Sequence, residues 1–271
     1  GGNMASMTVR LTNAQAGDVL SVRGTLPAGI TATVDTSVPG QIRLILTGAS
    51  SLANYQAVLR AVAFSNTDNA LVPGSRIIET TVNDGVTDSA VATTTINVTA
   101  VNDAPVFADT ALTITQTEDA GAPSGAVGTL VSSLVGGVTD ADGTDPKGIA
   151  VLSAVTGNGS WWYTIDGGVT WQALGVVSAT SARLLTAAAL TRLYFLPNAN
   201  YNGTVTSALT LRAWDGSNGL ANGSLATTFP NGGTTAFSSA FDIVALDVAA
   251  VNDAPTLTTT TFNPVVTPEG L

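Results

Sequence analysis

The chain of 271 residues contains no cysteine and no histidine, and its one lysine is Lys147. The missing residue types exclude disulfide bonds, zinc sites built on cysteine or histidine, haem ligation by histidine, and catalytic triads that use either side chain. Nine Lys and Arg residues stand against 19 Asp and Glu residues, so the formal net charge is −10. We therefore expect no nucleic-acid partner and no anionic membrane surface as partner, whereas cations suit this charge.

Long apolar runs and long helical patterns are also missing. No segment is apolar for long enough to span a membrane, so we expect no direct membrane insertion. Helical periodicity is confined to residues 51–59, where we expect a turn or two of helix capped by Ser50 or Ser51. No secretion signal is recognisable, and Gly1-Gly2 resembles a cloning remnant, so we expect a fragment from inside a larger chain.

Short alternating segments rich in β-branched residues recur along the chain, with turn residues between them. They include residues 7–11, 41–46, 75–82, 90–98 and 206–214. Alternation of this kind is typical of half-buried strands, and Gly, Asn, Asp and Pro supply the turns. The sequence predicts an all-β fold of tandem antiparallel β-sandwich domains, of the cadherin-like or Ig-like Greek-key type.

An exact repeat divides the chain. The sequence AVNDAP occurs at residues 100–105 and again at 250–255, so Asp253 lies 150 positions after Asp103. Other segments echo one another in the same order: 60–66 resembles 192–198, and 81–85 resembles 212–216. A fixed period of this kind indicates tandem structural repeats.

The repeat predicts four parts. They are a β-sandwich at 1–100, a calcium-binding linker at 101–105, a larger β-sandwich with extra hairpins at 106–250, and a linker with the first strand of a truncated third repeat at 251–271. The first sandwich is expected to be incomplete at its N-terminus, because it has no counterpart to Thr117-Glu118-Asp119 or to the acidic segment 139–145.

The few acidic residues gather in loops near the ends of the predicted units. Asp140, Asp142 and Asp145 alternate around Gly143, and a glycine allows an irregular loop to bend so that carboxylates converge on one cation. Ca²⁺ takes about 6–8 oxygen ligands. The candidate ligands are Asn102, Asp103, Asp140, Asp142, Asp145 and Asp215.

The alternative for these residues is a set of solvated turn residues, because Asp and Asn are common in turns. The repeated linker and the clustering of carboxylates in a chain with only 10% charged residues favour calcium. An EF-hand loop starting at Asp140 is rejected, because no flanking helices and no closing glutamate are visible.

The set AVNDAPVF, TEDAG, DADG and AWDG resembles the calcium signature of cadherin-like repeats. In that family, a linker of the form DxNDxxPxF meets DxD and AxDxG loops. The chain is most similar to cadherin-like and VCBS-type tandem repeats of large bacterial RTX-type surface adhesins. The resemblance covers nearly the whole sequence, and the combination of DADG with NDAP is its most specific part.

The resemblance implies ligand roles position by position. Asn102 and Asp103 match the linker pair, Asp140 and Asp142 match the DxD pair, and Asp215 matches the aspartate of AxDxG. Together these matches imply one interdomain Ca²⁺. The family linker carries Asp where this chain has Ala100, so we expect about one ion here rather than the three of animal cadherins.

The second linker matches as well. Asn252 and Asp253 stand at its ligand positions, and Glu118 or Glu269 is expected to serve that second junction.

The resulting functional hypothesis is a non-enzymatic extender segment of a large bacterial surface or secreted adhesin, stiffened by calcium and spacing a distal binding domain. Its expected location is extracellular, at the bacterial cell surface. The expected partners are neighbouring repeats of the same chain, with a cell-surface glycan or protein as a further candidate, and the fragment itself is expected to be a monomer.

The sequence leaves two alternative functions open. Trp161-Trp162-Tyr163 and Trp171 flank a predicted hairpin that could present rings to a glycan or a partner protein, although alternate aromatics in a strand more commonly pack into a core. The chain could also be an accessory domain of a secreted hydrolase. An active site within the chain is not expected, because Glu79 and Glu118-Asp119 are isolated carboxylates without a poised partner.

Overall fold

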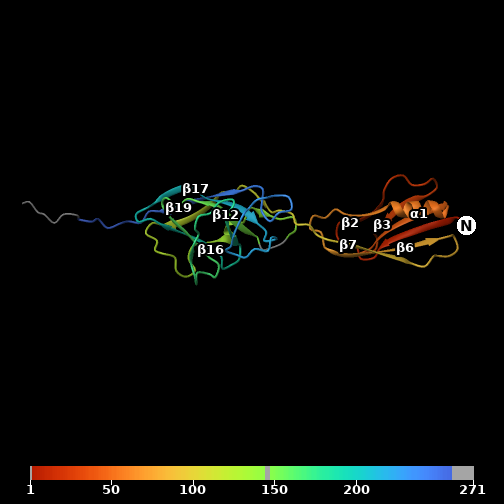
Figure 1. Ribbon diagram of the computed structural model, residues 1–271, viewed down its shortest axis with the longest axis horizontal. Coiled ribbons are helices and arrows are strands. Elements are labelled where there is room, and N and C mark those ends of the chain that lie inside the picture. The colour runs from red at the N-terminus through yellow and green to blue at the C-terminus, as the bar shows by residue number, and fades with distance from the viewer. Residues whose placement is uncertain (1, 144–146, 258–271) are drawn as a thin grey trace, which may run out of the picture.

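The structure is a computed structural model that describes residues 2–143 and 147–257. Asp145 and the expected strand after residue 257 therefore lie outside the described residues. Within these ranges the chain forms strands β1 to β19, one α-helix and one 3-10 helix, so the all-β prediction is confirmed. Two β-rich bodies follow one another along the chain (Figure 1). We refer to residues 2–98 as unit one and to residues 106–249 as unit two.

Unit one contains two antiparallel sheets and one helix. The larger sheet has the order β3-β4-β1-β6-β7, and the smaller sheet pairs β2 with β5. Their bounds are β1 (Met4–Leu11), β2 (Asp18–Val22), β3 (Thr31–Asp35), β4 (Ile42–Ser50), β5 (Val62–Asn66), β6 (Gly74–Asn83) and β7 (Ala92–Val98).

Alternation along the strands gives unit one its core. In β1, Met7, Val9 and Leu11 are buried, whereas the side chains between them are only partly covered. Helix α1 (Leu52–Ala61) lies where the periodicity predicted it. Ser51 is its N-cap and accepts a hydrogen bond from the Asn54 backbone N–H at 3.3 Å. The helix turns Tyr55 and Val58 toward the sheet, where both are buried.

A buried ion pair joins the two sheets of unit one. The Arg76 guanidinium, in β6, donates to the Asp18 carboxylate at 2.6 Å, and both side chains are almost fully buried. Burial by itself would raise the pKa of Asp18, but hydrogen bonds from Arg76, the Gln15 backbone and the Asn66 amide outweigh it and hold that pKa below its ordinary value. The pair is thus fully hydrogen-bonded inside the protein.

Unit two is larger and is built from two main sheets with a short strand pair beside them. The sheet orders are β18-β15-β12-β17-β19-β9, β10-β16-β13-β14 and β11-β8. The bounds are β8 (Val106–Phe107), β9 (Leu112–Thr117), β10 (Thr129–Leu130), β11 (Val138–Thr139), β12 (Gly148–Ala154), β13 (Gly159–Thr164), β14 (Gln172–Ala173), β15 (Ala182–Thr186), β16 (Arg192–Pro197), β17 (Gly203–Trp214), β18 (Leu225–Ala226) and β19 (Asp242–Ala249), with a 3-10 helix at Val131–Leu134.

The two units share a strand pattern. The order β4-β1-β6-β7 in unit one corresponds to β15-β12-β17-β19 in unit two, and the pair β2-β5 corresponds to β13-β16. Asp84-Gly85 follows β6 as Asp215-Gly216 follows β17, and each AVNDAP follows the last strand of its unit. The echoes in the sequence therefore fall on equivalent places in the two folds.

Candidate metal centre at the linker

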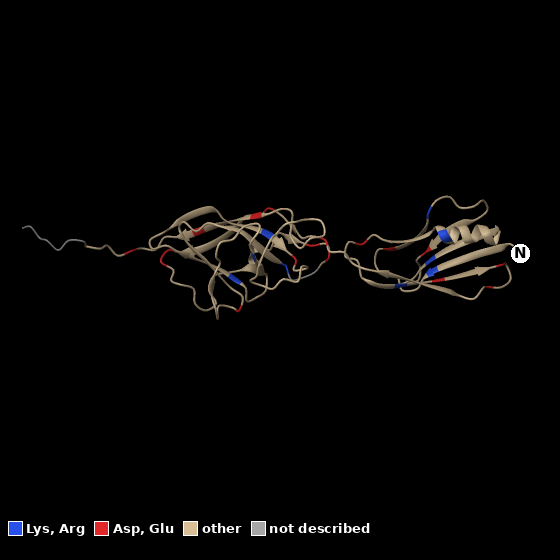
Figure 2. Cartoon of the chain, in the orientation of Figure 1, with Lys and Arg blue, Asp and Glu red and all other residues tan. Residues whose placement is uncertain are grey.

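The candidate ligands lie at the narrow connection between the two bodies, where acidic residues gather (Figure 2). Asp140 follows the short strand β11, and Asp215 follows the long strand β17. Asn102 and Asp103 belong to the linker after β7. Three separate stretches of the chain thus bring carboxylates and an amide to one end of unit two.

Hydrogen bonds connect these residues into one group. The Asn102 amide donates to the Asp215 carboxylate at 3.0 Å, and the Asp103 backbone N–H donates to the Asp142 carboxylate at 2.7 Å. The Asp142 backbone N–H in turn donates to Asp140 Oδ1 at 2.9 Å. Five of the six predicted ligands are therefore brought together, and the sixth, Asp145, lies outside the described residues.

The acidic loop after β11 is shaped by a tight turn. Gly143 has φ +64°, a left-handed conformation that glycine adopts without a steric penalty, and its N–H donates to the Asp140 carbonyl at 3.3 Å. On the other side of the site, the Ser217 backbone N–H holds Asp215 Oδ1 at 2.7 Å, and Asp215 is buried. Both loops thus fix the carboxylates by local backbone hydrogen bonds.

Asp140 is the candidate ligand whose surroundings most clearly disfavour a charged carboxylate. Its Oδ2 atom is buried and makes no hydrogen bond with any described residue. Burial raises the pKa of Asp140, and the nearby carboxylates of Asp215 and Asp142 raise it further. Lys147 opposes this effect from a distance, while its ammonium donates to the Val138 carbonyl at 3.2 Å. The ion pairs among the described residues all lie in unit one.

The donor set fits a hard cation by its chemistry, since carboxylate and amide oxygens are the ligands that Ca²⁺ takes. The unpartnered Asp140 oxygen is a free acceptor for such an ion. The described arrangement is nevertheless not a formed cage: within residues 2–143 and 147–257, no three acidic side chains are grouped closely enough to hold a metal. Asn102 also turns its NH₂ group, not its oxygen, toward Asp215. Binding therefore requires side-chain rotation.

The linker is anchored on unit two by a loop that sequence analysis missed. The Ala104 backbone N–H donates to the Gly233 carbonyl at 2.8 Å, and the Asn102 amide also donates to the Thr235 carbonyl at 3.2 Å. These loop residues are more than 120 positions away in sequence, and their turn-forming composition carries no sign of a partner. The first linker is therefore fixed mainly to the unit that follows it.

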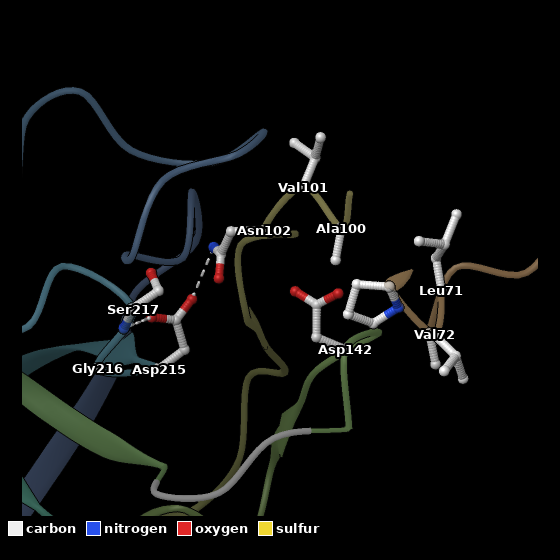
Figure 3. A pocket seen from close by; sticks show the side chains of 11 residues that line it. Leu71, Val72, Ala100, Val101, Asn102, Asp142, Asp215, Gly216 and Ser217 are labelled. Atoms are coloured by element: carbon white, nitrogen blue, oxygen red, sulfur yellow. Dashed lines mark hydrogen bonds between the residues drawn. The ribbon is translucent and has the colours of Figure 1, made fainter. Parts of the chain in front are cut away.

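Unit one contributes a hydrophobic loop, not ligands. Residues 70–73, the linker residues 100–102, Asp142 and residues 215–217 line a cavity of about 560 Å³ (Figure 3). Leu71 and Val72 reach this space from unit one, and the Asp142 carboxylate lies between them and Asn102 (Figure 3). The described candidate ligands come from the linker and unit two alone.

Glu118 lies beside the second linker, at the far end of unit two. It is almost fully buried and accepts hydrogen bonds from the Asn202 amide at 3.1 Å and from the Val251 backbone N–H at 3.0 Å. The neighbouring carboxylate of Asp119 raises the pKa of Asp253, with smaller contributions from burial and from Glu118. Asn252 and Asp253 are exposed, and Glu269 lies outside the described residues.

Trp162 and Trp171 lie on one face of the sheet, both beside Tyr194, whereas Trp161 lies on the other face, in the core. Trp161 is in the core of unit two, with its ring centroid 4.9 Å from that of Phe195. Trp162 points to the opposite face, and Trp171 packs edge-on against Tyr194 at 5.8 Å. All three indole N–H groups donate inside the protein, at 3.0 to 3.2 Å. Their polar groups are thus already engaged by the chain itself.

No protein-family model matches the sequence, and no curated protein matches it. Among solved structures, the chain is similar to a protocadherin gammaB7 EC3-6 cis-dimer structure, at 19% identity and a TM-score of 0.39, covering 91% of this chain and 45% of that one. It is also similar to the endo-fucoidan hydrolase MfFcnA4 of glycoside hydrolase family 107, at 14% identity and a TM-score of 0.25, covering 88% and 24%.

The chain spans less than half the length of either structure. At these scores the likeness assigns no family and no activity, and the fold rests on the strand pairing described above. The described residues contain no helix long and apolar enough to cross a membrane.

Proposed function

We propose that this chain is a non-enzymatic extender segment of a larger extracellular adhesin, of the cadherin-like kind found in bacterial RTX-type surface proteins, and that Ca²⁺ stiffens its linker. The observation that carries the proposal is the buried Oδ2 atom of Asp140, which has no hydrogen-bond partner among the described residues and lies at the linker, near the carboxylates of Asp142 and Asp215.

Electrostatic repulsion explains how the ion would act. Without a cation, burial disfavours the charged form of Asp140 and raises its pKa, and the nearby carboxylates of Asp215 and Asp142 add to this effect. Asn102 and Asp103, in the linker, already contact two of these carboxylates by hydrogen bonds. A bound Ca²⁺ would neutralise the repulsion between these carboxylates and would connect the linker to the two loops of unit two. Its ligands would be Asp140, Asp142, Asp215, Asp103 and the Asn102 oxygen.

Calcium concentration would then control the stiffness of the array. Extracellular calcium modules bind at about 10⁻⁴–10⁻³ M, which is above cytosolic but within extracellular concentrations. An ion present at about ten times its Kd stabilises the state that binds it by about 1.4 kcal/mol. Neighbouring repeats of the same chain are the primary partners in this proposal, and the segment spaces a distal binding domain from its anchor.

The other carboxylates support a structural role. Glu79 forms an ion pair with Arg10, and Glu118 is held by Asn202 and the second linker. Both carboxylates are thus already engaged by other groups of the chain, whereas acid–base hydrolysis requires a poised pair in a cleft. The hairpin of Trp161 and Trp171 is not proposed as a glycan site, because Trp161 is in the core and both indole N–H groups already donate to backbone carbonyls, of Val155 and Gly125.

Calorimetric titration of chelator-stripped protein tests the proposal. We expect saturable binding of about one Ca²⁺ per chain and a higher melting temperature with the ion. Asp142→Asn keeps a hydrogen-bond acceptor for the Asp103 N–H but loses the charge, so we expect affinity to fall at least tenfold. Asp109→Asn is the matched control, because Asp109 is exposed and makes no hydrogen bond with the described residues. Equal binding by both variants would contradict the assignment.

A further inference from the structure

The first and the last strand of the larger sheet in unit two lie side by side. β9 and β19 run parallel from Leu112 opposite Val244 to Thr117 opposite Ala249, whereas the other strand pairs of this sheet are antiparallel. The chain enters this sheet by β9, and β19 is the last strand before the second linker. The parallel pair therefore joins the beginning and the end of the unit directly.

The course of the chain determines how tension along it reaches this pair. The chain enters unit two at the first linker and leaves it at the opposite end, and both strands run from the first linker toward the second (Figure 1). Tension therefore pulls β9 backward by its start and β19 forward by its end, so it drives the two strands past each other. Hydrogen bonds in a parallel pair are evenly spaced, and such sliding strains all of them together. Strands that are peeled apart from one end instead lose their hydrogen bonds one at a time.

Side-chain packing opposes the same sliding. Ile114 of β9 and Leu246 of β19 are at most 2% exposed and belong to one core cluster. Thr113 and Thr115, on either side of Ile114, are exposed. Because side chains alternate between the two faces of a strand, a slip by one residue would move Ile114 out of the core and threonine into it. The core thus holds the register of the pair.

A buried carboxylate holds the start of the pair together. Asp242, the first residue of β19, is 2% exposed. Its Oδ2 atom accepts hydrogen bonds from the Thr110 backbone N–H at 3.1 Å and from the Thr110 hydroxyl at 2.8 Å. Thr110 stands two positions before β9, so tension from the first linker reaches this contact before it reaches the paired residues. Hydrogen bonds to an ionised acceptor are about twice as strong as neutral ones.

A second buried carboxylate holds the other end. Glu118 follows β9 directly and is 4% exposed. Its backbone N–H donates to the Ala249 carbonyl at 2.8 Å, and its carboxylate accepts a hydrogen bond from the Val251 backbone N–H at 3.0 Å. The Asn202 amide, next to β17, donates to the same carboxylate at 3.1 Å. Tension from the second linker therefore reaches the Glu118 contacts first.

We propose that β9 and β19, with Asp242 and Glu118 at their two ends, form a clamp that transmits mechanical tension through unit two without opening it. The inference rests on the proposed function, in which the chain connects an anchor to a distal binding domain. Within the described part of unit two, Asp242 and Glu118 are the buried acidic residues outside the candidate calcium site. Burying a carboxylate is costly unless it is hydrogen-bonded, and both stand where they hold the ends of the sheared pair. None of these contacts uses a candidate calcium ligand, so the clamp acts with or without the ion.

Single-molecule force spectroscopy with two pairs of attachment points tests the clamp. The full chain is used in EDTA, so that the outcome is independent of the proposed calcium site. The chain has no cysteine, so Val101→Cys with Leu257→Cys places handles at exposed sites on either side of unit two and shears the pair. Val101→Cys with Phe241→Cys pulls instead at the starts of both strands and peels them apart. At one loading rate we expect the shearing geometry to require at least about twice the force of the peeling geometry.

A matched pair of substitutions tests the contact at the start of the clamp. Thr110→Val removes the hydroxyl that donates to Asp242 and keeps the shape of the side chain. Thr113→Val makes the same replacement on the exposed face of β9. At constant force in the shearing geometry, we expect Thr110→Val to unfold about tenfold faster than the unsubstituted clamp, and Thr113→Val to stay within about twofold of it.

The outcomes separate this inference from the proposed function. Equal forces in the two geometries would overturn the clamp, as would equal unfolding rates of Thr110→Val and Thr113→Val, whatever calorimetry shows for calcium. A failure to bind calcium, together with greater resistance in the shearing geometry, would overturn the calcium site and leave the clamp standing.

Discussion

The two AVNDAP linkers are identical in sequence and differ in their surroundings. In the first, Asn102 and Asp103 are partly buried and hydrogen-bonded to Asp215 and Asp142 of unit two. In the second, Asn252 and Asp253 are exposed, and within the described part of the chain the Asn252 amide donates to the adjacent Asp253 carbonyl, at 3.4 Å. The contacts of the first motif therefore come from loops of unit two, whereas the Val251 N–H of the second motif is held by Glu118 of the unit before it.

The units themselves show the same dependence on neighbouring segments. Unit two contains β9 and the acidic loop after β11, and these segments both complete its core and provide carboxylates to the linker before it. Unit one has neither in the described residues; its interior holds an apolar cluster and the buried pair of Arg76 and Asp18. The initial segment of unit two thus contributes both to the core of that unit and to the junction before it.

The largest expected effect concerns that buried pair. Arg76→Ala leaves the Asp18 carboxylate buried without its cation, and breaking such a pair destabilises a protein by about 3–5 kcal/mol. We expect the free energy of unfolding of unit one to fall by this amount in denaturant titrations, with unit two unaffected. Arg43→Ala is the control, since the partly exposed surface pair of Arg43 and Asp35 is expected to contribute about 0–1 kcal/mol. Equal effects would contradict the role given to the buried pair.

A second substitution tests what β9 contributes to unit two. Ile114 is 2% exposed in the core, and truncation of a buried isoleucine to alanine destabilises by about 2–5 kcal/mol. We therefore expect Ile114→Ala to lower the stability of unit two and leave unit one unchanged, as measured by denaturant unfolding. Thr113→Ala, on the exposed side of the same strand, should change stability by less than about 0.5 kcal/mol.

Because the two linkers are identical, the same substitution in each shows which linker determines the calcium affinity. Asn102→Ala removes a predicted ligand, and we expect calcium affinity to fall about tenfold, equivalent to about 1.4 kcal/mol. Asn252→Ala makes the same change in the second linker, where described residues provide no equivalent of Asp142 and Asp215, and should leave that affinity unchanged. Calorimetric titration of the two variants measures the difference, and a larger loss for Asn252→Ala would reverse the assignment.

The smallest expected effect is a dependence of unit one on pH. The pKa of Asp18 is lowered in the folded chain from its ordinary value of 3.8. Its contribution to stability is therefore fully present above that ordinary value and is lost as pH falls through the lower folded pKa. Melting of unit one between pH 6 and pH 2.5 should show this loss, and Asp18→Asn should remove that part of the dependence. A loss that begins well above pH 4 would contradict it.

Local patterns predicted a large part of the fold. Alternation in segments such as 7–11 and 206–214 predicted strands, because burial of every second side chain is a local property of a pleated strand. The periodicity of 51–59 likewise predicted α1. The preference of alternate aromatics for a core also held for Trp161 and Tyr163, which are both buried.

The candidate site was predictable in composition but not in geometry. The repeated linker and the alternate carboxylates identified residues that the fold brings together at one end of unit two. The anchoring of the linker by Gly233 and Thr235 depends on contacts over more than 120 positions, which leave no local signal. The orientation of the Asn102 amide depends on the Asp215 carboxylate, 113 positions away, and only the folded arrangement determines it.

Distance measurements between the two units test the central claim most directly. The chain has no cysteine, so Val86→Cys and Val176→Cys, both at highly exposed sites, provide one spin-label site in each unit. Double electron–electron resonance should give a narrow distribution of distances with Ca²⁺ and a broad one in EDTA, and Asp142→Asn should stay broad in both. The same width with and without calcium would contradict the claim that the ion stiffens the linker.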